Sequence, residues 1–277
     1  MPGIKTDSSR PGGLFRRPTG AAIKFCVLSS GSKGNALWVE AGGRAVLVDC
    51  GLTLKELRRR LRSTGLDPAR LEAIVVSHEH RDHISGVGVT ARRLRLPVHI
   101  NQGTLKRVPE TAGRFRTEIF ETGKEFSTAG LVLRPFSLSH DTADPVGFTF
   151  EQDGVKLGLA TDLGVSTNLV RERLGGCQAL ILEANHDYDM LMTGPYPWPL
   201  KQRVNSRRGH LSNKDSAELL AAVEHPGLKT VVLAHLSEVN NHPDLVLDFF
   251  RSSFKPGPDG FTLTTASQYE PGRLIKV

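Results

Sequence analysis

The sequence predicts an α/β fold in which two β-sheets pack together and helices cover their outer faces. Three observations support this prediction: short apolar runs separated by Gly-containing turns open the chain, helical segments lie between later runs, and apolar runs resume in the second half. With 277 residues, 39% of them hydrophobic, the chain can also bury a substantial core.

The strands are predicted from apolar runs that end at turn residues, and the first three runs follow one another closely. The chain therefore opens with a sheet. We expect strands at residues 23–28, 36–40, 44–49, 73–76, 131–138, 146–151, 155–160, 179–182, 231–234 and 261–265.

Helices are expected between several of these strands, because apolar residues there recur at helical spacing. In residues 53–62 the leucines fall on one helical face, which leaves Arg58, Arg59, Arg60 and Arg62 toward water. Residues 1–22 contain Pro, Gly, Ser and cations and are expected to form a flexible basic tail before a single domain at 23–277. The predicted helices span residues 53–62, 87–94, 213–223 and 244–250.

The charge and the cysteines restrict the class of protein. A formal net charge of +7 favours a polyanionic partner such as nucleic acid, although a basic proteome would give the same balance. Cys26, Cys50 and Cys177 lie far apart and form neither a disulfide framework nor a metal-binding pair, which fits the cytoplasm. No signal-peptide core and no apolar run of roughly 18 residues is present, so we expect no membrane contact. The oligomeric state does not follow from the sequence.

The most informative segment is SHEHRDH at residues 77–83, directly after the apolar run 73–76. His78, His80, Asp82 and His83 lie close together, a density that a solvated surface loop seldom reaches. Imidazole and carboxylate groups suit a divalent cation such as Zn²⁺, and the absence of a nearby cysteine argues against a structural thiolate site. We therefore predict a catalytic metal site, in which Asp82 and His83 can serve a second ion.

Three further candidate ligands follow apolar strands elsewhere in the chain. His140 lies in SLSHD, Asp162 in LATDLG and His235 in VVLAHLS. A single histidine or aspartate at a strand end is more often a cap or a hydrogen-bonded core group. The repeated pattern of an apolar strand followed by a ligand-type residue favours metal binding for all three.

The order HxHxDH, strand-end His, Asp and last His resembles the metallo-β-lactamase superfamily signature. Seven segments resemble, more narrowly, its YycJ (WalJ) branch: LSSGSKGNALWVE, VDCGL, ATDLG, EANHD, PYPW, GHLSN and AHLSEVNN. The resemblance implies an αββα sandwich of two mixed sheets with the metals at one edge, and 5′ to 3′ DNA exonuclease activity. It also implies two divalent ions, Zn²⁺ or Mn²⁺. One would be bound by His78, His80 and His140 and the other by Asp82, His83 and His235, with Asp162 bridging.

Two such ions can hold a shared water as hydroxide near neutral pH and can neutralise charge on a phosphodiester under attack. Asp82 can accept a hydrogen bond from that hydroxide and orient it. Lactam and thioester hydrolysis use the same cluster, so residues outside the ligand set must select the substrate.

Three features favour nucleic acid, and the family resemblance, rather than these features, implies DNA in preference to RNA. Basic residues in KQRVNSRR can contact phosphates, and the aromatic residues before them can stack on bases. The start of the helix at 213 and the loop SSGSKGN can offer N–H groups and hydroxyls to an anion. A solvated loop, a helix cap and an ordinary turn are the alternatives. The candidate contacts are Ser30, Ser32, Asn35, Tyr196, Trp198, Lys201, Arg203, Arg207, Arg208, Ser212 and Asn213.

His186 and His210 are the candidates to protonate the leaving alcohol, and His210 could instead hold a terminal 5′-phosphate. In related tRNA-processing enzymes a histidine precedes the glutamate after this strand, whereas here Leu182 precedes Glu183, which argues against tRNA 3′ processing. Two alternatives stay open: hydrolysis of a small ester or phosphodiester, and a non-catalytic regulatory protein. The intact ligand set argues against the second.

Overall fold

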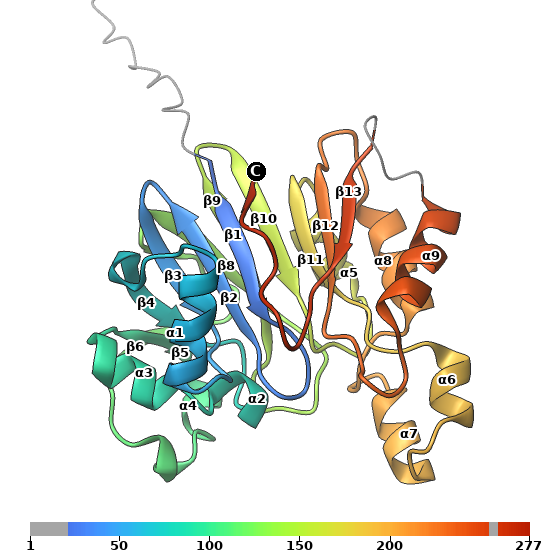
Figure 1. Cartoon of the computed structure of the whole chain (residues 1–277), viewed down its shortest axis with the longest axis horizontal. Helices are drawn as coiled ribbons and strands as arrows, with labels where there is room; N and C mark the ends of the chain where they lie inside the picture. Colours follow the sequence, from blue (N-terminus) through green and yellow to red (C-terminus); the bar gives the residue numbers. More distant parts are fainter. Residues whose placement is uncertain (1–21, 255–259) are drawn as a thin grey trace, which may run out of the picture.

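The computed structural model describes residues 22–254 and 260–277, so nearly all of the predicted basic tail at 1–22 lies outside the described residues. The described residues form two seven-stranded sheets that pack face to face (Figure 1). The first half of the chain builds one sheet, which the last strand joins, and the second half builds the other. The predicted pair of packed sheets is thereby confirmed.

The first sheet has the order β14-β1-β2-β3-β4-β5-β6. Its first strands pair antiparallel and β3 to β6 pair in parallel, so the sheet is mixed. Its strands are β1 (Lys24–Ser29), β2 (Ala36–Ala41), β3 (Arg44–Val48), β4 (Leu71–Val75), β5 (Val98–Asn101), β6 (Thr117–Phe120) and β14 (Ile275–Lys276).

The second sheet has the order β13-β12-β11-β10-β9-β8-β7, antiparallel from β7 to β10 and parallel from β10 to β13. Its central parallel strands are covered on both faces, which is why β11 and β12 are mostly apolar and are buried along their whole length. Its strands are β7 (Phe126–Thr128), β8 (Leu131–Ser137), β9 (Val146–Gln152), β10 (Val155–Ala160), β11 (Ala179–Glu183), β12 (Thr230–Ala234) and β13 (Thr262–Thr265).

The helices complete four layers, because α1 and α3 pack on the outer face of the first sheet and α5, α8 and α9 on that of the second. Aromatic and branched side chains such as Phe25, Phe148 and Phe150 fill the space between the sheets. The helices are α1 (Leu54–Ser63), α2 (Arg81–Ile84), α3 (Val87–Leu94), α4 (Gln102–Leu105), α5 (Asn168–Leu174), α6 (Tyr188–Thr193), α7 (Trp198–Val204), α8 (Asn213–Val223) and α9 (Pro243–Ser253), with single 3₁₀ turns at Pro68–Arg70 and Glu110–Ala112.

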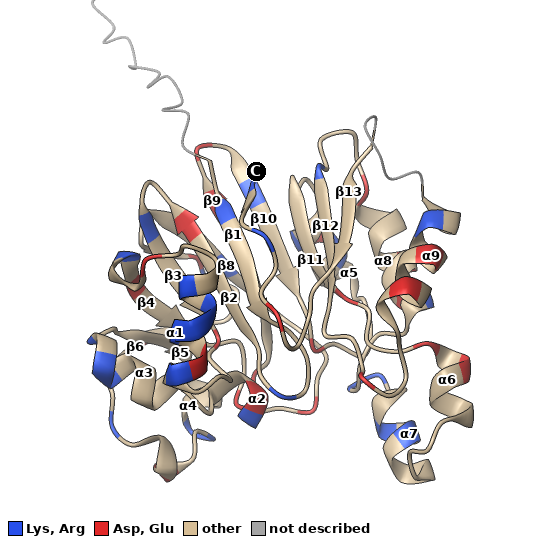
Figure 2. Ribbon diagram, in the orientation of Figure 1, with Lys and Arg blue, Asp and Glu red and all other residues tan. Residues whose placement is uncertain are grey.

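Charged side chains lie mainly on the helices and loops, and α1 carries several of the cations (Figure 2). One of them corrects a prediction. Arg60 was expected to face water, but it is buried, and its guanidinium donates to the backbone oxygens of Leu28 and Gln268 at 2.7 and 3.0 Å. The helical periodicity places Arg60 beside Leu57 and Leu61, so it lies within the packed face of α1.

The strands β5, β6, β7 and β14 and the helices α2, α4, α5, α6 and α7 were not predicted. α6 and α7 matter most for the site, since they project beside the edge where α2 lies (Figure 1). The basic segment KQRVNSRR begins inside α7, so it is half helix rather than an extended loop. Among the described residues, no helix has the length and apolar character needed to cross a membrane.

Candidate active site

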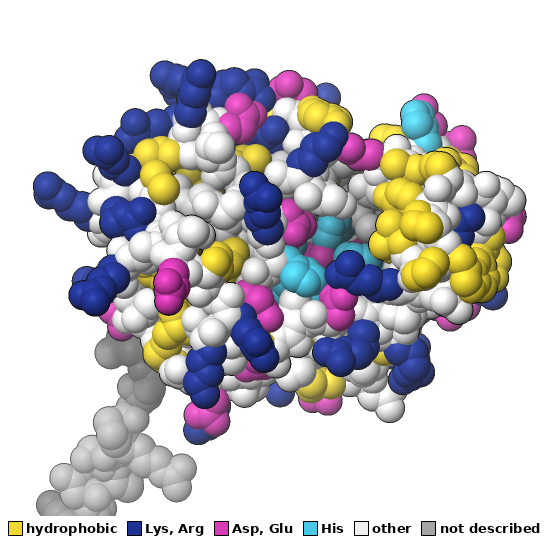
Figure 3. Space-filling model, turned by 90° about the horizontal axis from the view of Figure 1, so that it is seen from below, with side chains coloured by type: hydrophobic (Ala, Val, Ile, Leu, Met, Phe, Trp, Pro, Cys, Tyr) yellow, Lys and Arg dark blue, Asp and Glu magenta, His cyan; other side chains and the backbone are white. Residues whose placement is uncertain are grey.

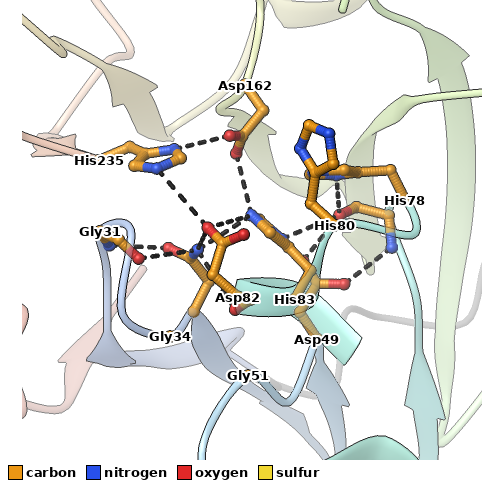
Figure 4. Close-up of polar contacts among 12 residues, drawn as sticks. Gly31, Gly34, Asp49, Gly51, His78, His80, Asp82, His83, Asp162 and His235 are labelled. Carbon is orange, nitrogen blue, oxygen red and sulfur yellow. Dashed lines mark hydrogen bonds and ion pairs between the residues drawn. The ribbon is translucent and has the colours of Figure 1, made fainter. Parts of the chain in front are cut away.

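The seven predicted metal ligands follow the ends of four strands and converge at one edge of the two sheets. His78, His80, Asp82 and His83 follow β4 of the first sheet. The other three come from the second sheet, where His140 follows β8, Asp162 follows β10 and His235 follows β12. Figure 4 shows six of these side chains directed toward one centre, with Asp162 between His235 and His83.

Ligand-type atoms that lie within 4.8 Å of one another form three overlapping groups among the described residues. The groups are His78, His80 and His140; His78, His83 and Asp162; and Asp162, Glu183, His210 and His235. Asp162 connects them, since its carboxylate lies 3.3 Å from Nε2 of His83, 2.9 Å from Nδ1 of His235 and 3.9 Å from Nε2 of His140. Asp82 belongs to none of the three groups and lies beside them, 3.5 Å from Nε2 of His83.

The backbone is strained where the strands deliver these side chains. Asp49, Asp162 and His235 have φ angles of 58°, 63° and 55°, in the left-handed region that non-glycine residues adopt at a cost. Each lies just beyond the end of a strand, at β3, β10 and β12. Three of the six non-glycine residues with a positive φ angle among the described residues therefore lie at the edge of the sheets that carries the candidate ligands.

Three histidines have their outer ring nitrogen held by a neighbouring group. The Nδ1 atoms of His78, His83 and His140 lie 3.0 Å from Ser77 Oγ, 2.8 Å from Asp49 Oδ2 and 3.1 Å from the carbonyl oxygen of Gly209. Such contacts fix the orientation of metal-binding imidazoles.

The inner atoms of the cluster are left for an ion. Nε2 of His78 and Oδ2 of Asp162 are buried, with no hydrogen-bond partner among the described residues. Buried polar atoms without partners are costly, and a divalent cation would satisfy both of them. The imidazole and carboxylate donor set fits Zn²⁺ and comparable ions.

The carboxylates and imidazoles shift one another's pKa. Burial alone would lower the pKa of His235, but the carboxylates of Asp162, Glu183 and Asp82 raise it to about 9. Burial alone would raise the pKa of Asp162, but the imidazoles of His235 and His83 hold it well below its ordinary value. The site thus keeps buried carboxylates charged, an arrangement that a cation stabilises.

Glu183, at the end of β11, binds several groups at the bottom of the site. It was not predicted as a site residue. Its carboxylate is fully buried and accepts hydrogen bonds from the backbone N–H groups of Asp162, Leu163 and Leu211 at 3.2, 3.1 and 2.9 Å. It also lies 2.8 Å from Nδ1 of His210. Glu183 therefore connects Asp162 to His210.

The loop SSGSKGN braces the metal centre from the first sheet. Asn35 is buried, and its side-chain amide donates to Asp82 Oδ2 at 3.0 Å. Ser30 is also buried, and its hydroxyl accepts from the backbone N–H of His235 at 2.8 Å. Of the three loop residues expected to contact nucleic acid, Ser32 is the one that lines the open cleft.

The cleft above the ligands has a volume of about 350 Å³. Figure 3 shows histidines at the bottom of this hollow, Lys and Arg around it, and a hydrophobic patch on the side of α6 and α7. Its lining includes Arg81, Tyr196, Arg203 and His210 beside the ligands. Arg81 is exposed and has no ion-pair partner among the described residues. It lies between the candidate ligands His80 and Asp82 in the sequence, and the metal-binding motif does not require a cation at this position.

The other residues of α7 and of the segment after it that were expected to contact nucleic acid differ in exposure and in their partners. Trp198 is 61% exposed and Arg207 is exposed. Arg203 forms an ion pair with Asp141 at 2.7 Å, and Arg208 donates to the carbonyl oxygen of His140 at 3.2 Å. Lys201 is buried and donates to the carbonyl oxygen of Met192, so it holds α6 against α7.

Side chains of the first turn of α8 cap the N-terminus of this helix. Ser212 and Asp215 form a reciprocal capping box, in which the hydroxyl accepts from the backbone N–H of Asp215 at 3.1 Å. Asn213 is buried and pairs with Asn241. His186 is fully buried, burial lowers its pKa, and it does not line the cleft. We therefore propose no nucleic-acid contact for Ser212 and Asn213 and no proton-donor role for His186.

Two further residues escaped the sequence analysis, Asp49 and Asp141. Asp49 lies in VDCGL just after β3, and its carboxylate contacts Nδ1 of His83. Asp141 follows a ligand directly and lines the cleft. Position after a strand end, the same signal that indicated Asp162, could have pointed to Asp49 and Glu183.

The two packed sheets and the histidine and aspartate cluster at their edge define a class, the metal-dependent hydrolases. Residues 44–236 match the model of a family described as the beta-lactamase superfamily domain. The chain is 37% identical over 226 residues to "Exodeoxyribonuclease YycJ" of Bacillus anthracis, covering 80% of this chain and 86% of that protein. It is 35% identical to "Exodeoxyribonuclease WalJ" of Streptococcus pneumoniae, covering 80% and 85%.

Among solved structures, the metallo-beta-lactamase fold protein YhfI from Bacillus subtilis superposes with a TM-score of 0.72 at 16% identity, covering 93% of this chain and 100% of that one. The chain belongs to the metallo-β-lactamase superfamily and, within it, to the YycJ/WalJ branch. The predicted fold and the prediction of a metal-dependent hydrolase are both confirmed.

Proposed function

We propose that this enzyme is a DNA exonuclease that degrades a strand from its 5′ end with two divalent ions, Zn²⁺ or Mn²⁺. The observation that carries the proposal is that the overlapping histidine and aspartate groups and the Glu183–His210 pair meet at the bottom of one cleft, which Arg81 and Arg203 line. The names of the relatives support a DNA substrate. The cytoplasmic location that we also propose is supported by the three buried, unpaired cysteines.

In the proposed centre, His78, His80 and His140 would hold one ion and Asp82, His83 and His235 the other. Asp162 would bridge them, as its distances to both groups support. When bound, the ions would supply a nucleophile at neutral pH and neutralise charge on the phosphate.

The protein's own groups then direct the reaction. Asp82 is held by the amide of Asn35, which leaves its other oxygen available to accept a hydrogen bond from the attacking water and orient it. His210 presents Nδ1 to the buried Glu183, so Nε2 lies on the cleft side, where it can donate a proton to the leaving oxygen. Its ring centroid is 5.1 Å from that of His140 and 5.2 Å from that of His235.

This position favours the proton-donor role of His210 over the terminal-phosphate role. The N-terminus of α8 carries the carboxylate of Asp215 in its capping box, which would repel a phosphate. The pair with Glu183 also directs the ring into the centre rather than toward the helix end.

Substrate selection would come from the rim of the cleft. Arg81 and Arg207 are exposed cations that can contact phosphates, and Ser32 offers a hydroxyl. Tyr196 lines the cleft and Trp198 is exposed on α7, so both can stack on unpaired bases.

A DNA strand labelled at either end tests the proposal. With Zn²⁺ or Mn²⁺ present, the enzyme should release mononucleotides from the 5′ end, and the 3′ label should remain on shortened strands. Mononucleotides released first from the 3′ end would refute the polarity. Faster hydrolysis of a small chromogenic phosphodiester, with DNA left intact, would instead support the small-substrate alternative.

A further inference from the structure

We infer that Asp141 is a positioning residue of the metal centre that acts through His80, and that Arg203 of α7 holds Asp141 in place. The inference rests on the metal centre of the proposed function and is independent of the nucleic-acid substrate. It assigns a role to an acidic side chain outside the seven ligands.

His80 differs from the other ligands after β4. His78 and His83 are fixed through Nδ1 by Ser77 and Asp49, and both rings are buried. His80 instead directs Nδ1 inward, 3.2 Å from Nε2 of His140, and its side chain is 31% exposed. Its outer nitrogen is therefore Nε2, at the wall of the cleft.

Asp141 is the carboxylate that faces this outer nitrogen. Its Oδ1 lies 3.6 Å from Nε2 of His80 and 3.5 Å from Nε2 of His140. The same Oδ1 is buried and has no hydrogen-bond partner among the described residues. At 3.6 Å this contact is an ion pair rather than a hydrogen bond, so Asp141 acts on Nε2 of His80 through its charge.

Arg203 fixes the orientation of this carboxylate. Its Nε donates to Asp141 Oδ2 at 2.7 Å, which leaves Oδ1 directed at the histidines. Arg203 belongs to α7, whereas Asp141 follows β8, so the ion pair joins these two segments at the wall of the cleft. The contact connects the helix that carries Trp198 to a metal ligand.

A carboxylate on the outer nitrogen of a metal-binding histidine fixes its tautomer and makes the inner nitrogen a better donor. Removing such a partner typically weakens metal binding by about 10- to 100-fold. We therefore expect Asp141 to act on the ion that His80 binds and not on the other ion.

The test measures metal release from the fully loaded enzyme to a coloured chelator, with Zn²⁺ as the metal. Asp141→Ala should weaken one of two ions by about 10- to 100-fold and leave the second unchanged. Arg203→Ala and Asp141→Asn should give smaller losses, because the first keeps the carboxylate without its anchor and the second keeps one oxygen without the negative charge. Arg207→Ala, which removes an exposed arginine four residues from Arg203, is the matched control and should change neither ion.

Three outcomes would overturn the inference: wild-type affinity for both ions in Asp141→Ala, equal loss of both ions, or a loss in Asp141→Asn as large as in Asp141→Ala. The last would indicate a direct ligand. Thermal unfolding of each loaded variant shows that the fold is intact, and Arg203→Ala keeps the test decisive if Asp141→Ala does not fold. Digestion of DNA by the wild type reports on the proposed function separately, since metal release involves no nucleic acid.

Discussion

Replacing Glu183 with alanine is expected to remove most of the protein's resistance to unfolding. The carboxylate accepts three backbone hydrogen bonds, from Asp162, Leu163 and Leu211, and contacts His210. Each buried donor left unpaired costs about 1–3 kcal/mol, so three donors give a loss of roughly 3–9 kcal/mol. Domains are typically stable by only about 5–15 kcal/mol.

Glu183→Gln keeps the size of the side chain, so it separates the loss of hydrogen bonds from the loss of side-chain volume. The amide keeps one oxygen for two of the N–H groups and turns its NH₂ toward the backbone N–H of Asp162, so the expected loss is about 1–3 kcal/mol. Glu218→Ala, at an exposed position of α8, is the control and should stay within about 0.5 kcal/mol.

Urea unfolding followed by circular dichroism measures these losses, with a chelator present so that metal binding does not add to the stability. A loss below about 1 kcal/mol in Glu183→Ala would refute the reasoning. It would mean that water or a rearranged backbone satisfies the three donors.

Asp162→Ala should abolish hydrolysis and reduce the metal content measured by atomic absorption, because both ions lose a shared ligand; normal occupancy with normal activity would exclude a bridge. Arg81→Ala should lower the slope of DNA affinity against salt concentration by about one charge in fluorescence anisotropy, whereas Arg58→Ala, on α1, should not. His210→Ala should slow cleavage by about 10²- to 10⁴-fold at full metal occupancy, and equally at 5′-phosphate and 5′-hydroxyl ends; a loss confined to phosphorylated ends would restore the terminal-phosphate role. In chelator, the protein should lose stability between pH 6.5 and 9, since the pKa of His235 is raised from 6.5 to about 9 and the stabilisation by its protonated form is lost over that range. Urea midpoints that do not change over this range would contradict the pKa shift.

Most of the strands that could be predicted are apolar and buried, although β13 was also predicted and its side chains are exposed or half-buried. β10 and β12 read as apolar runs because parallel strands under helices have no solvent face. β6 and β7 could not be found in this way, since they lie at the sheet edges and their side chains are largely exposed or half-buried. α7 was hidden because its Pro-rich start suggests a loop, although proline is well tolerated in the first turn of a helix.

The candidate ligands could be recognised because each follows an apolar strand, and the structure brings these side chains together at one edge of the sheets. The supporting contacts could not be recognised, since they depend on which loops meet in space. Nothing in the sequence places Asp141 beside His80, or Glu183 beside His210, and the separation of these residues along the chain gives no local pattern. Lys201 illustrates the same limit, because only the packing of α6 on α7 shows that its ammonium group is bound internally.

The division of the ligands between the two sheets has a consequence beyond the reaction. Four of them follow β4 of the first sheet and three follow strands of the second, so bound ions would fasten the two halves of the chain together at one edge. Each tenfold excess of free metal over its dissociation constant would then add about 1.4 kcal/mol of resistance to unfolding. In a cell short of metal, the protein would be degraded faster as well as inactive, which would link its abundance to the metal supply.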